Sequence, residues 1–165
     1  MTRAAHGIAL GLVSVAAVFA PLAAPAAENP TIRVIDGDGF ELATGEKIRL
    51  WGIDAPELRQ ECSKGGVRYA CGKIARDNLD LLLAGQSVQC EEKDRDRYGR
   101  TVALCTAGGE DVAGWMVSHG WALDWPKYSG GRYSVQQAEA KNAGLGLWAG
   151  FFAVPWEWRE KDRSP

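Results

Sequence analysis

The sequence predicts an α+β protein that is mainly β: an OB-fold, which is a five-stranded barrel, with three packed α-helices. Two observations support this. Short β-branched or alternating segments are separated by turn residues, and longer segments carry apolar residues at helical spacing. Their order is three strands, a helix, two strands and two helices. That order is typical of a small closed barrel with helices packed against it.

Five segments are predicted to form the strands of this barrel. The first is β-branched and ends at Asp36-Gly37, a dipeptide favoured in hairpin turns. A turn at Thr44-Gly45-Glu46 precedes the third strand, and Pro56 follows its end. A charged loop joins the last two as a hairpin. The five are Thr31–Ile35, Gly39–Leu42, Lys47–Ile53, Ser87–Glu91 and Thr101–Thr106.

Three helices are predicted from apolar periodicity and from end signals. The first covers Val67–Ala84 and is followed by Gly85, which suits the position after a helix. Asp111 is placed to cap a second helix that runs through His119. Ser134–Ala143 forms the third, which ends at Gly144.

The first 26 residues resemble an export signal rather than part of the fold. Arg3 precedes the apolar run Ile8–Ala20, and Ala24-Pro25-Ala26 supplies a signal-peptidase pattern. The alternative is an uncleaved anchor, but the run is short for a span of about 20 residues. We therefore expect a cleaved signal peptide at 1–26, a domain at 27–150 and a C-terminal tail at 151–165. The mature chain is expected to be exported, periplasmic or extracellular, without membrane attachment.

The four cysteines follow the predicted cleavage site, so export would place them in an oxidising compartment. We predict disulfides Cys62–Cys71 and Cys90–Cys105, because each pair brackets a local turn or hairpin. Each loop closure would stabilise the fold by about 3 kcal/mol. A four-thiolate zinc site is the alternative, but neither pair has the C-x(2–4)-C spacing of such sites.

The charge balance excludes a strongly basic protein. There are 19 Lys and Arg against 21 Asp and Glu, a formal net charge of −2, and cleavage would also remove Arg3. Proteins that bind duplex nucleic acid tightly and without sequence preference usually present a basic face. Net charge therefore argues against such binding, although not against turnover of a nucleic acid.

Three segments carry the residues that point to chemistry. Asp36-Gly37-Asp38 is by itself most often a tight turn, although its second acid is free to project. In Asp54-Ala55-Pro56-Glu57, the proline directs two carboxylates out of a strand end. Strict strand alternation would put Arg49 and Asp54 on opposite faces, so they share a site only if the strand bends or ends between them. Arg100 ends the third segment, Asp96-Arg97-Tyr98-Gly99-Arg100, which could also be an ordinary solvated loop.

Together these segments offer acids and arginines suited to phosphodiester hydrolysis. Carboxylate oxygens hold hard divalent cations, and guanidinium groups bind a phosphate whose charge increases during the reaction. The three segments resemble the staphylococcal nuclease (thermonuclease) family, and the resemblance extends from about Thr31 to Trp148. It implies an OB barrel with three helices and a Ca²⁺-dependent endonuclease that hydrolyses DNA and RNA. The expected substrate is single-stranded or locally open nucleic acid, and we expect a monomer.

The resemblance also implies roles for individual acids. Asp38 and Asp54 would be the carboxylate ligands of Ca²⁺, together with the backbone carbonyl of Ala55. Asp36 would support these ligands without binding the metal itself. Glu57 would orient or deprotonate the attacking water. Gly39 stands where the family commonly has threonine, which removes a hydroxyl group.

The implied arginine and aromatic roles concern the phosphate and the bases. Arg49 and Arg100 would stabilise charge in the transition state, while Arg97 and Tyr98 would hold a neighbouring phosphate. Tyr128 matches one of the family's base-stacking tyrosines. Two further stacking candidates are Trp125 and Tyr133. Structural roles are expected for Trp115, Trp121 and Trp148, and no function is assigned to the tryptophan-rich tail.

Two other functions remain open. A non-catalytic module of the same fold would bind nucleic acid or a protein partner, although such modules typically lose part of the acid and arginine set. An exported OB-type domain that binds saccharide or peptide through its tryptophans would ignore calcium.

Only His119 remains after signal cleavage, which excludes paired-histidine ribonuclease chemistry.

Overall fold

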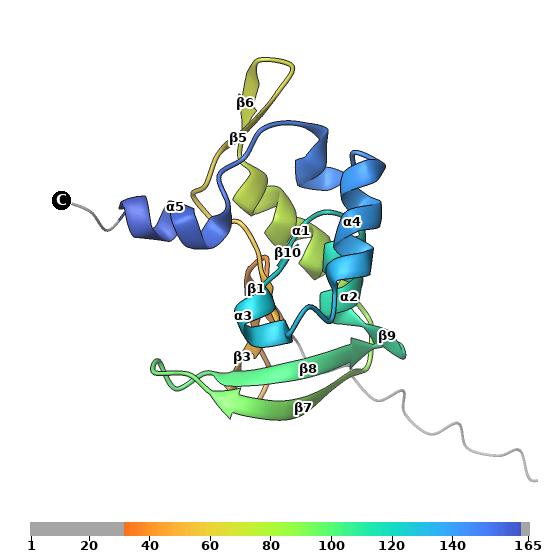
Figure 1. Ribbon diagram of the computed structural model, residues 1–165. Helices are drawn as coiled ribbons and strands as arrows, with labels where there is room; N and C mark the ends of the chain where they lie inside the picture. The colour runs from red at the N-terminus through yellow and green to blue at the C-terminus, as the bar shows by residue number, and fades with distance from the viewer. Residues whose placement is uncertain (1–31, 163–165) are drawn as a thin grey trace, which may run out of the picture.

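A computed structural model describes residues 32–162 of the 165-residue chain, and Figure 1 shows its elements. The main sheet has the order β1-β2-β3-β8-β7, and the short β9 pairs with β8. Every pairing is antiparallel except that of β3 with β8, where Ile48 lies opposite Thr101. This five-strand order confirms the predicted mainly β, OB-type fold class. The bounds are β1 Arg33–Asp36, β2 Gly39–Glu41, β3 Lys47–Leu50, β7 Val88–Arg95, β8 Thr101–Ala107 and β9 Glu110–Asp111.

The three predicted helices are present, and further short helices accompany them. The predicted ones are α1 (Cys71–Leu83), α2 (Val112–Ser118) and α4 (Ser134–Asn142). Asp111 caps α2 as expected, because its Oδ1 accepts a hydrogen bond from the Gly114 amide at 3.1 Å. The additional elements are α3 (Pro126–Ser129), the 3₁₀-helix η1 (Gly146–Ala149) and α5 (Pro155–Asp162).

The prediction of a helix from Val67 was wrong for its first turn. β5 (Cys62–Lys64) and β6 (Val67–Tyr69) form a hairpin with Cys62 opposite Tyr69, and α1 begins only at Cys71. The hairpin projects at the top of Figure 1. Val67 matched the helical spacing by chance, since its side chain is exposed at the end of the hairpin turn.

The third predicted strand is also interrupted, and this interruption shapes the site. β3 ends at Leu50, and β4 (Ile53–Asp54) pairs instead with β10 (Leu123–Asp124) in a separate two-stranded sheet. Gly52 lies between them with φ of 78°, a left-handed conformation that suits glycine. The chain therefore turns sharply after Leu50.

Two hydrophobic clusters form the interior. The larger one joins the main sheet to α1, α2 and Tyr133, which directly precedes α4, with Phe40, Leu79 and Met116 fully buried; Trp115 and Trp121 pack against it. The smaller one contains Leu123, Leu147 and the Cys62–Cys71 disulfide, and Trp148 and Trp156 pack on it. Residues 152–156 of the C-terminal tail are thus part of the packed structure.

Both predicted disulfides are present. Cys90 and Cys105 face each other across β7 and β8, with Cα atoms 4.1 Å apart. Cys62 in β5 joins Cys71 at the start of α1, with Cα atoms 5.6 Å apart. No cysteine of the chain is left free, so the alternative of a four-thiolate zinc site is wrong.

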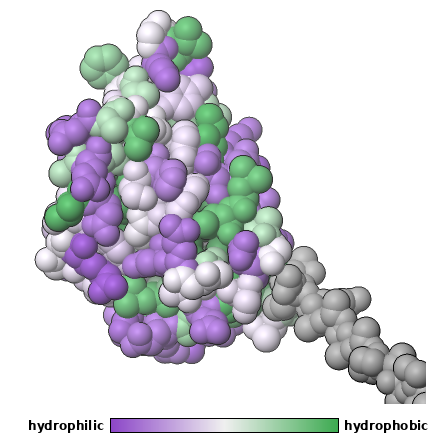
Figure 2. All heavy atoms as spheres, turned by 90° about the vertical axis from the view of Figure 1, so that its right-hand side faces the viewer, coloured by the Kyte–Doolittle hydropathy of each residue, from purple (hydrophilic) through white to green (hydrophobic). Residues whose placement is uncertain are grey.

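The exterior carries mixed polarity on the side shown in Figure 2, where hydrophilic and hydrophobic residues are interspersed. Among residues 32–162, no helix has the length and apolar character needed to cross a bilayer. The predicted signal peptide at 1–26 lies outside the residues that the structure describes.

Candidate active site

The predicted metal-binding acids lie around one buried arginine. Nη2 of Arg49 donates to Asp54 Oδ1 at 2.7 Å, and Nη1 of Arg49 forms an ion pair with Asp38 Oδ1. Asp38 Oδ2 accepts from the Ala55 amide at 2.7 Å. Asp54 is 0% exposed. Burial lowers the pKa of Arg49 from its ordinary value, while the negative charges of Asp54 and Asp36 act in the opposite direction.

The turn at Gly52 explains how Arg49 and Asp54 reach each other. In a continuous strand they would point to opposite faces. Because the chain turns sharply after Leu50, Arg49 Nη2 also reaches the Ile53 carbonyl oxygen at 3.2 Å. The sequence left open whether the strand bends or ends between Arg49 and Asp54. The structure shows that it ends there.

Asp36 lies behind this cluster, at the end of β1. Its Oδ1 accepts from the Asp38 amide at 3.2 Å and so fixes the turn that carries Asp38. Burial raises the pKa of Asp36 above its ordinary value, although Arg49 and Arg100 both act in the opposite direction. A β-carbon added at Gly39 would come within 2.9 Å of Asp36 Oδ1, so threonine at this position would require Asp36 to move.

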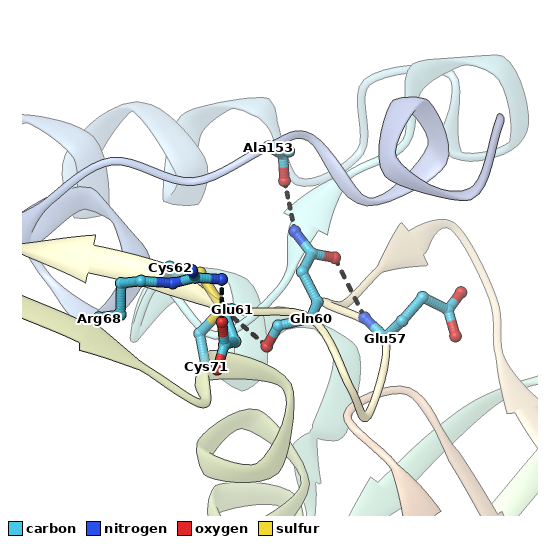
Figure 3. The surroundings of a disulfide bond; sticks show 7 residues. All are labelled: Glu57, Gln60, Glu61, Cys62, Arg68, Cys71 and Ala153. Atoms are coloured by element: carbon cyan, nitrogen blue, oxygen red, sulfur yellow. Dashed lines mark hydrogen bonds and ion pairs between the residues drawn. A yellow bond between two sulfur atoms is a disulfide. The ribbon is translucent and has the colours of Figure 1, made fainter. Parts of the chain in front are cut away.

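Glu57 is held by a loop whose centre is Gln60. The Gln60 amide donates to the Glu57 carbonyl oxygen at 2.7 Å, and Gln60 Oε1 accepts from the Glu57 amide at 3.2 Å. Gln60 Nε2 donates to the Ala153 carbonyl oxygen at 2.6 Å, which ties the loop to the C-terminal segment. Figure 3 shows Gln60 between these partners, next to the disulfide Cys62–Cys71, with the carboxylate of Glu57 directed away. Sequence reasoning missed Gln60.

Arg100 is positioned by Asp96 within the β7–β8 loop. Asp96 Oδ1 accepts from the amides of Tyr98 and Arg100, at 2.9 and 3.0 Å, and its Oδ2 accepts from Arg100 Nε at 2.7 Å. Burial alone would raise the pKa of Asp96, but the hydrogen bonds from Arg100 and Tyr98 and the charge of Arg100 lower it. The charged loop is therefore an ordered turn, and it directs a guanidinium towards the acids.

These residues line one cleft of about 680 Å³. The residues predicted to serve the metal, the catalysis or the substrate line it, apart from the buried Asp54 and Tyr133: Asp36, Asp38, Arg49, Ala55, Glu57, Arg97, Tyr98, Arg100, Trp125 and Tyr128. The β7–β8 loop and α5 lie on the same side of the molecule, at the left of Figure 1, and both contribute to the wall.

The aromatic candidates divide into two groups. Tyr98 and Tyr128 are exposed at the cleft, and Trp125 packs edge-on to Tyr128 with ring centroids 4.5 Å apart. Arg97 lies over the Tyr98 ring at 5.4 Å. Tyr133 is 1% exposed and donates to Asp111 Oδ2 at 3.2 Å, so it is a core residue and was a wrong candidate for base stacking.

Arg159 is the charged residue of the site that the sequence did not reveal. From α5 its Nη1 and Nη2 contact Asp54 Oδ1 and Oδ2 at 2.9 and 2.8 Å, and Nη1 also contacts Glu57 Oε1 at 2.9 Å. Pro155 at the start of α5 is a signal for a helix in the tail. No local pattern indicates a contact between residues so far apart in the chain.

The donor set fits a hard divalent cation. Two carboxylates, from Asp38 and Asp54, converge on one guanidinium, which shows that this position attracts positive charge. Among residues 32–162, no three His, Cys, Asp or Glu side chains are arranged to bind a metal. A hard cation bound here would therefore take further oxygens from the backbone, water or substrate, as Ca²⁺ commonly does.

Known proteins provide an independent comparison. Residues 47–150 match the protein family described as "Staphylococcal nuclease homologue". The chain is 40% identical to "Succinoglycan biosynthesis protein ExoI" of Rhizobium meliloti (strain 1021), over 88% of this chain and 82% of that protein. It is 35% identical to an "Uncharacterized endonuclease" of Escherichia coli O157:H7, over 79% and 83% of the two chains. It is also 33% identical to "Micrococcal nuclease" of Shigella flexneri, over 81% and 80%.

The matched region runs from β3 through η1 and includes Arg49, Asp54, Glu57 and Arg100. It ends before α5, so Arg159 falls outside it. Since the match covers more than half of the chain and agrees with the strand order, the protein belongs to the staphylococcal nuclease family.

Proposed function

We propose that this protein is a Ca²⁺-dependent endonuclease that hydrolyses phosphodiester bonds of DNA and RNA. Its family supports a nuclease. The observation that carries the finer proposal is the meeting of two buried carboxylates, Glu57 and two arginines at one cleft. This is the residue chemistry that a hard cation and a phosphate need together.

Each side chain would have a separate task. Asp38, Asp54 and the carbonyl of Ala55 would hold Ca²⁺, which when bound would polarise the phosphate and position water. Glu57, partly exposed at the cleft, would orient that water or take its proton. Arg49 and Arg100 would stabilise negative charge that builds up on the phosphate oxygens.

The remaining contacts would serve the rest of the substrate. Arg97 and Tyr98 would hold a neighbouring phosphate, and the exposed ring of Tyr128 would stack on a base of single-stranded or locally open nucleic acid. We also propose export and removal of residues 1–26. The two disulfides support an oxidising compartment.

The proposal is tested by cleavage of single-stranded DNA and RNA by residues 27–165 with both disulfides formed. Calcium is compared with magnesium and with a calcium chelator. We expect calcium-dependent cleavage, and a loss of at least about 100-fold in both Glu57→Ala and Arg100→Ala, in line with removal of one catalytic group. Arg33→Ala is the control, because Arg33 pairs with Glu41 on the exposed surface, away from the cleft.

Circular dichroism confirms that each variant is folded. A folded Arg100→Ala protein with near wild-type turnover would contradict the role of Arg100. If the calcium-saturated wild type binds DNA but cleaves nothing, the protein is a non-catalytic binding module. Ligand binding that is indifferent to calcium would instead point to a saccharide- or peptide-binding domain.

A further inference from the structure

The C-terminal helix α5 places a third arginine on the acids of the site. The fork of Arg159 spans both oxygens of Asp54, at 2.9 and 2.8 Å, and its Nη1 also reaches Glu57 Oε1 at 2.9 Å. Its side chain is 22% exposed. Burial alone would lower the pKa of Arg159, but the hydrogen bonds and charges of Asp54 and Glu57 raise it, so the group is a permanent cation.

Several contacts hold α5 over the site. The ring of Trp156 stacks on Trp125 with centroids 5.7 Å apart, and the guanidinium of Arg159 lies over the same Trp125 ring at 5.4 Å. Arg59 pairs with Asp162 at 2.6 Å and lies over the ring of Trp158. The segment that leads into the helix is fixed as well, because Gln60 donates to the Ala153 carbonyl oxygen. These contacts determine where Arg159 points.

Asp54 already contacts two guanidinium groups, which leave no room for a metal ion beside them. Its Oδ1 accepts from Arg49 and from Arg159, so both lone pairs of that oxygen are used. Its Oδ2 is bound by Arg159 Nη2, and the residue is 0% exposed. A metal ion can bind Asp54 only if a guanidinium moves away. Arg49 also binds Asp38 and lies in the barrel, whereas Arg159 approaches from a terminal helix.

We propose that Arg159 is a built-in competitor of the metal ion: it occupies Asp54 when no metal is bound and must leave Asp54 before a divalent cation can bind there. The proposal rests on the proposed role of Asp54 as a metal ligand. Linkage makes the effect reciprocal. Arg159 weakens metal binding, and metal binding weakens the attachment of α5. The C-terminal helix thereby sets the calcium concentration at which the enzyme is active.

Calcium binding without substrate tests the competition, measured by isothermal titration calorimetry on the purified protein with disulfides intact. We expect Arg159→Gln to bind Ca²⁺ roughly tenfold more tightly than the wild type, within the usual range of coupling between two sites. Arg159→Lys should be intermediate, because it keeps the charge but not the two-pronged contact. Arg33→Gln removes an equal charge from an exposed surface pair and should change nothing.

A second measurement follows the helix itself. Amide hydrogen exchange in residues 155–162 should become faster when Ca²⁺ is added to the wild type. Arg59→Gln, which loosens α5 without touching Asp54, should tighten Ca²⁺ binding by a smaller factor than Arg159→Gln. These two results would not follow if Arg159 only supported the fold, since general damage would weaken metal binding.

The measurements distinguish failure of this inference from failure of the proposed function. If wild type and Arg159→Gln bind Ca²⁺ equally well, or the variant binds it less well, the competition is wrong while the metal site stands. If no variant binds Ca²⁺ and none cleaves nucleic acid, the proposed function itself is wrong, and this inference falls with it.

Discussion

At the scale of single residues, Arg49 has a structural task beside its proposed catalytic one. Arg49 is buried between Asp38 and Asp54. Without it, these two buried carboxylates would lose the cation that they share. Arg100 differs, because it lies in a loop and pairs with the partly exposed Asp96. The two arginines therefore require different experiments.

We expect Arg49→Ala to destabilise the fold by about 3–5 kcal/mol, as removal of one member of a buried ion pair usually does. Urea unfolding in the absence and presence of Ca²⁺ measures this. Calcium should recover part of the loss, because a cation at Asp38 and Asp54 would replace the missing charge. Arg100→Ala is the comparison, and its stability should change by less than about 1 kcal/mol. An equal loss in both variants would contradict the distinction.

At the scale of elements, the sequence predicted what depends on local periodicity and turns. The β1–β2 hairpin, β8, α2 and α4 were predicted closely, because apolar spacing and end signals are local. The strand predicted at Ser87–Glu91 runs on to Arg95, because its charged end still pairs with β8 and lacks the apolar alternation that marks a strand. The break at Gly52 was not, since a strand pattern such as Lys47–Ile53 continues across a single glycine. The role of Arg159 could not be predicted, because its contact with Asp54 depends on how the C-terminal segment packs on the smaller hydrophobic cluster.

The first turn of α1 fits tightly against the Glu57 loop, and this gives an element-scale prediction. A β-carbon built at Gly72 would lie 1.8 Å from the Glu57 carbonyl oxygen, so Gly72→Ala must displace the loop or the helix. We expect a stability loss of about 1–3 kcal/mol and a fall in turnover of the folded fraction. The Gly72 amide also donates to the Gln60 carbonyl oxygen at 3.3 Å, so the shift would reach Gln60.

Gly114→Ala is the matched control for Gly72→Ala. It also adds a β-carbon inside a helix, but the nearest atoms would lie at an ordinary 3.4–3.5 Å. Its stability should stay the same or rise, since alanine favours helix over glycine by about 1 kcal/mol. Thermal unfolding and turnover, measured for both variants, separate the two effects. Full activity in a stable Gly72→Ala protein would show that the Glu57 loop is not held by this contact.

At the scale of the whole molecule, the site is assembled from segments that span the described chain from β1 to α5. β1, β3, the Glu57 loop, the β7–β8 loop, α3 and α5 all reach the cleft. The arginines there are largely committed to acids: Arg49, Arg100 and Arg159 each form an ion pair. The four arginines that line the cleft are thus offset by five acids, Asp36, Asp38, Glu57, Asp94 and Asp96, and the chain as a whole carries a formal net charge of −2.

This distribution predicts a weak salt dependence of substrate binding. For single strands, the logarithm of the binding constant falls by about 0.7 per phosphate neutralised for each logarithmic unit of salt. We expect a slope of roughly −1 to −2 for the wild-type cleft. Arg97, which forms no ion pair with another residue of 32–162 and lies over Tyr98, should account for one such contact. Arg97→Gln should therefore reduce the slope by about 0.7.

Fluorescence anisotropy of a labelled single-stranded oligonucleotide measures the slope, with Glu57→Gln as a background that prevents cleavage. Arg132→Gln is the control, because Arg132 is exposed outside the cleft, near Asp111, and should leave the slope unchanged. Arg97→Gln should weaken binding by a similar factor for different base sequences, since a phosphate contact carries no sequence information. A slope steeper than about −4 would require a basic surface beyond the cleft, which the acidic balance of this chain does not favour.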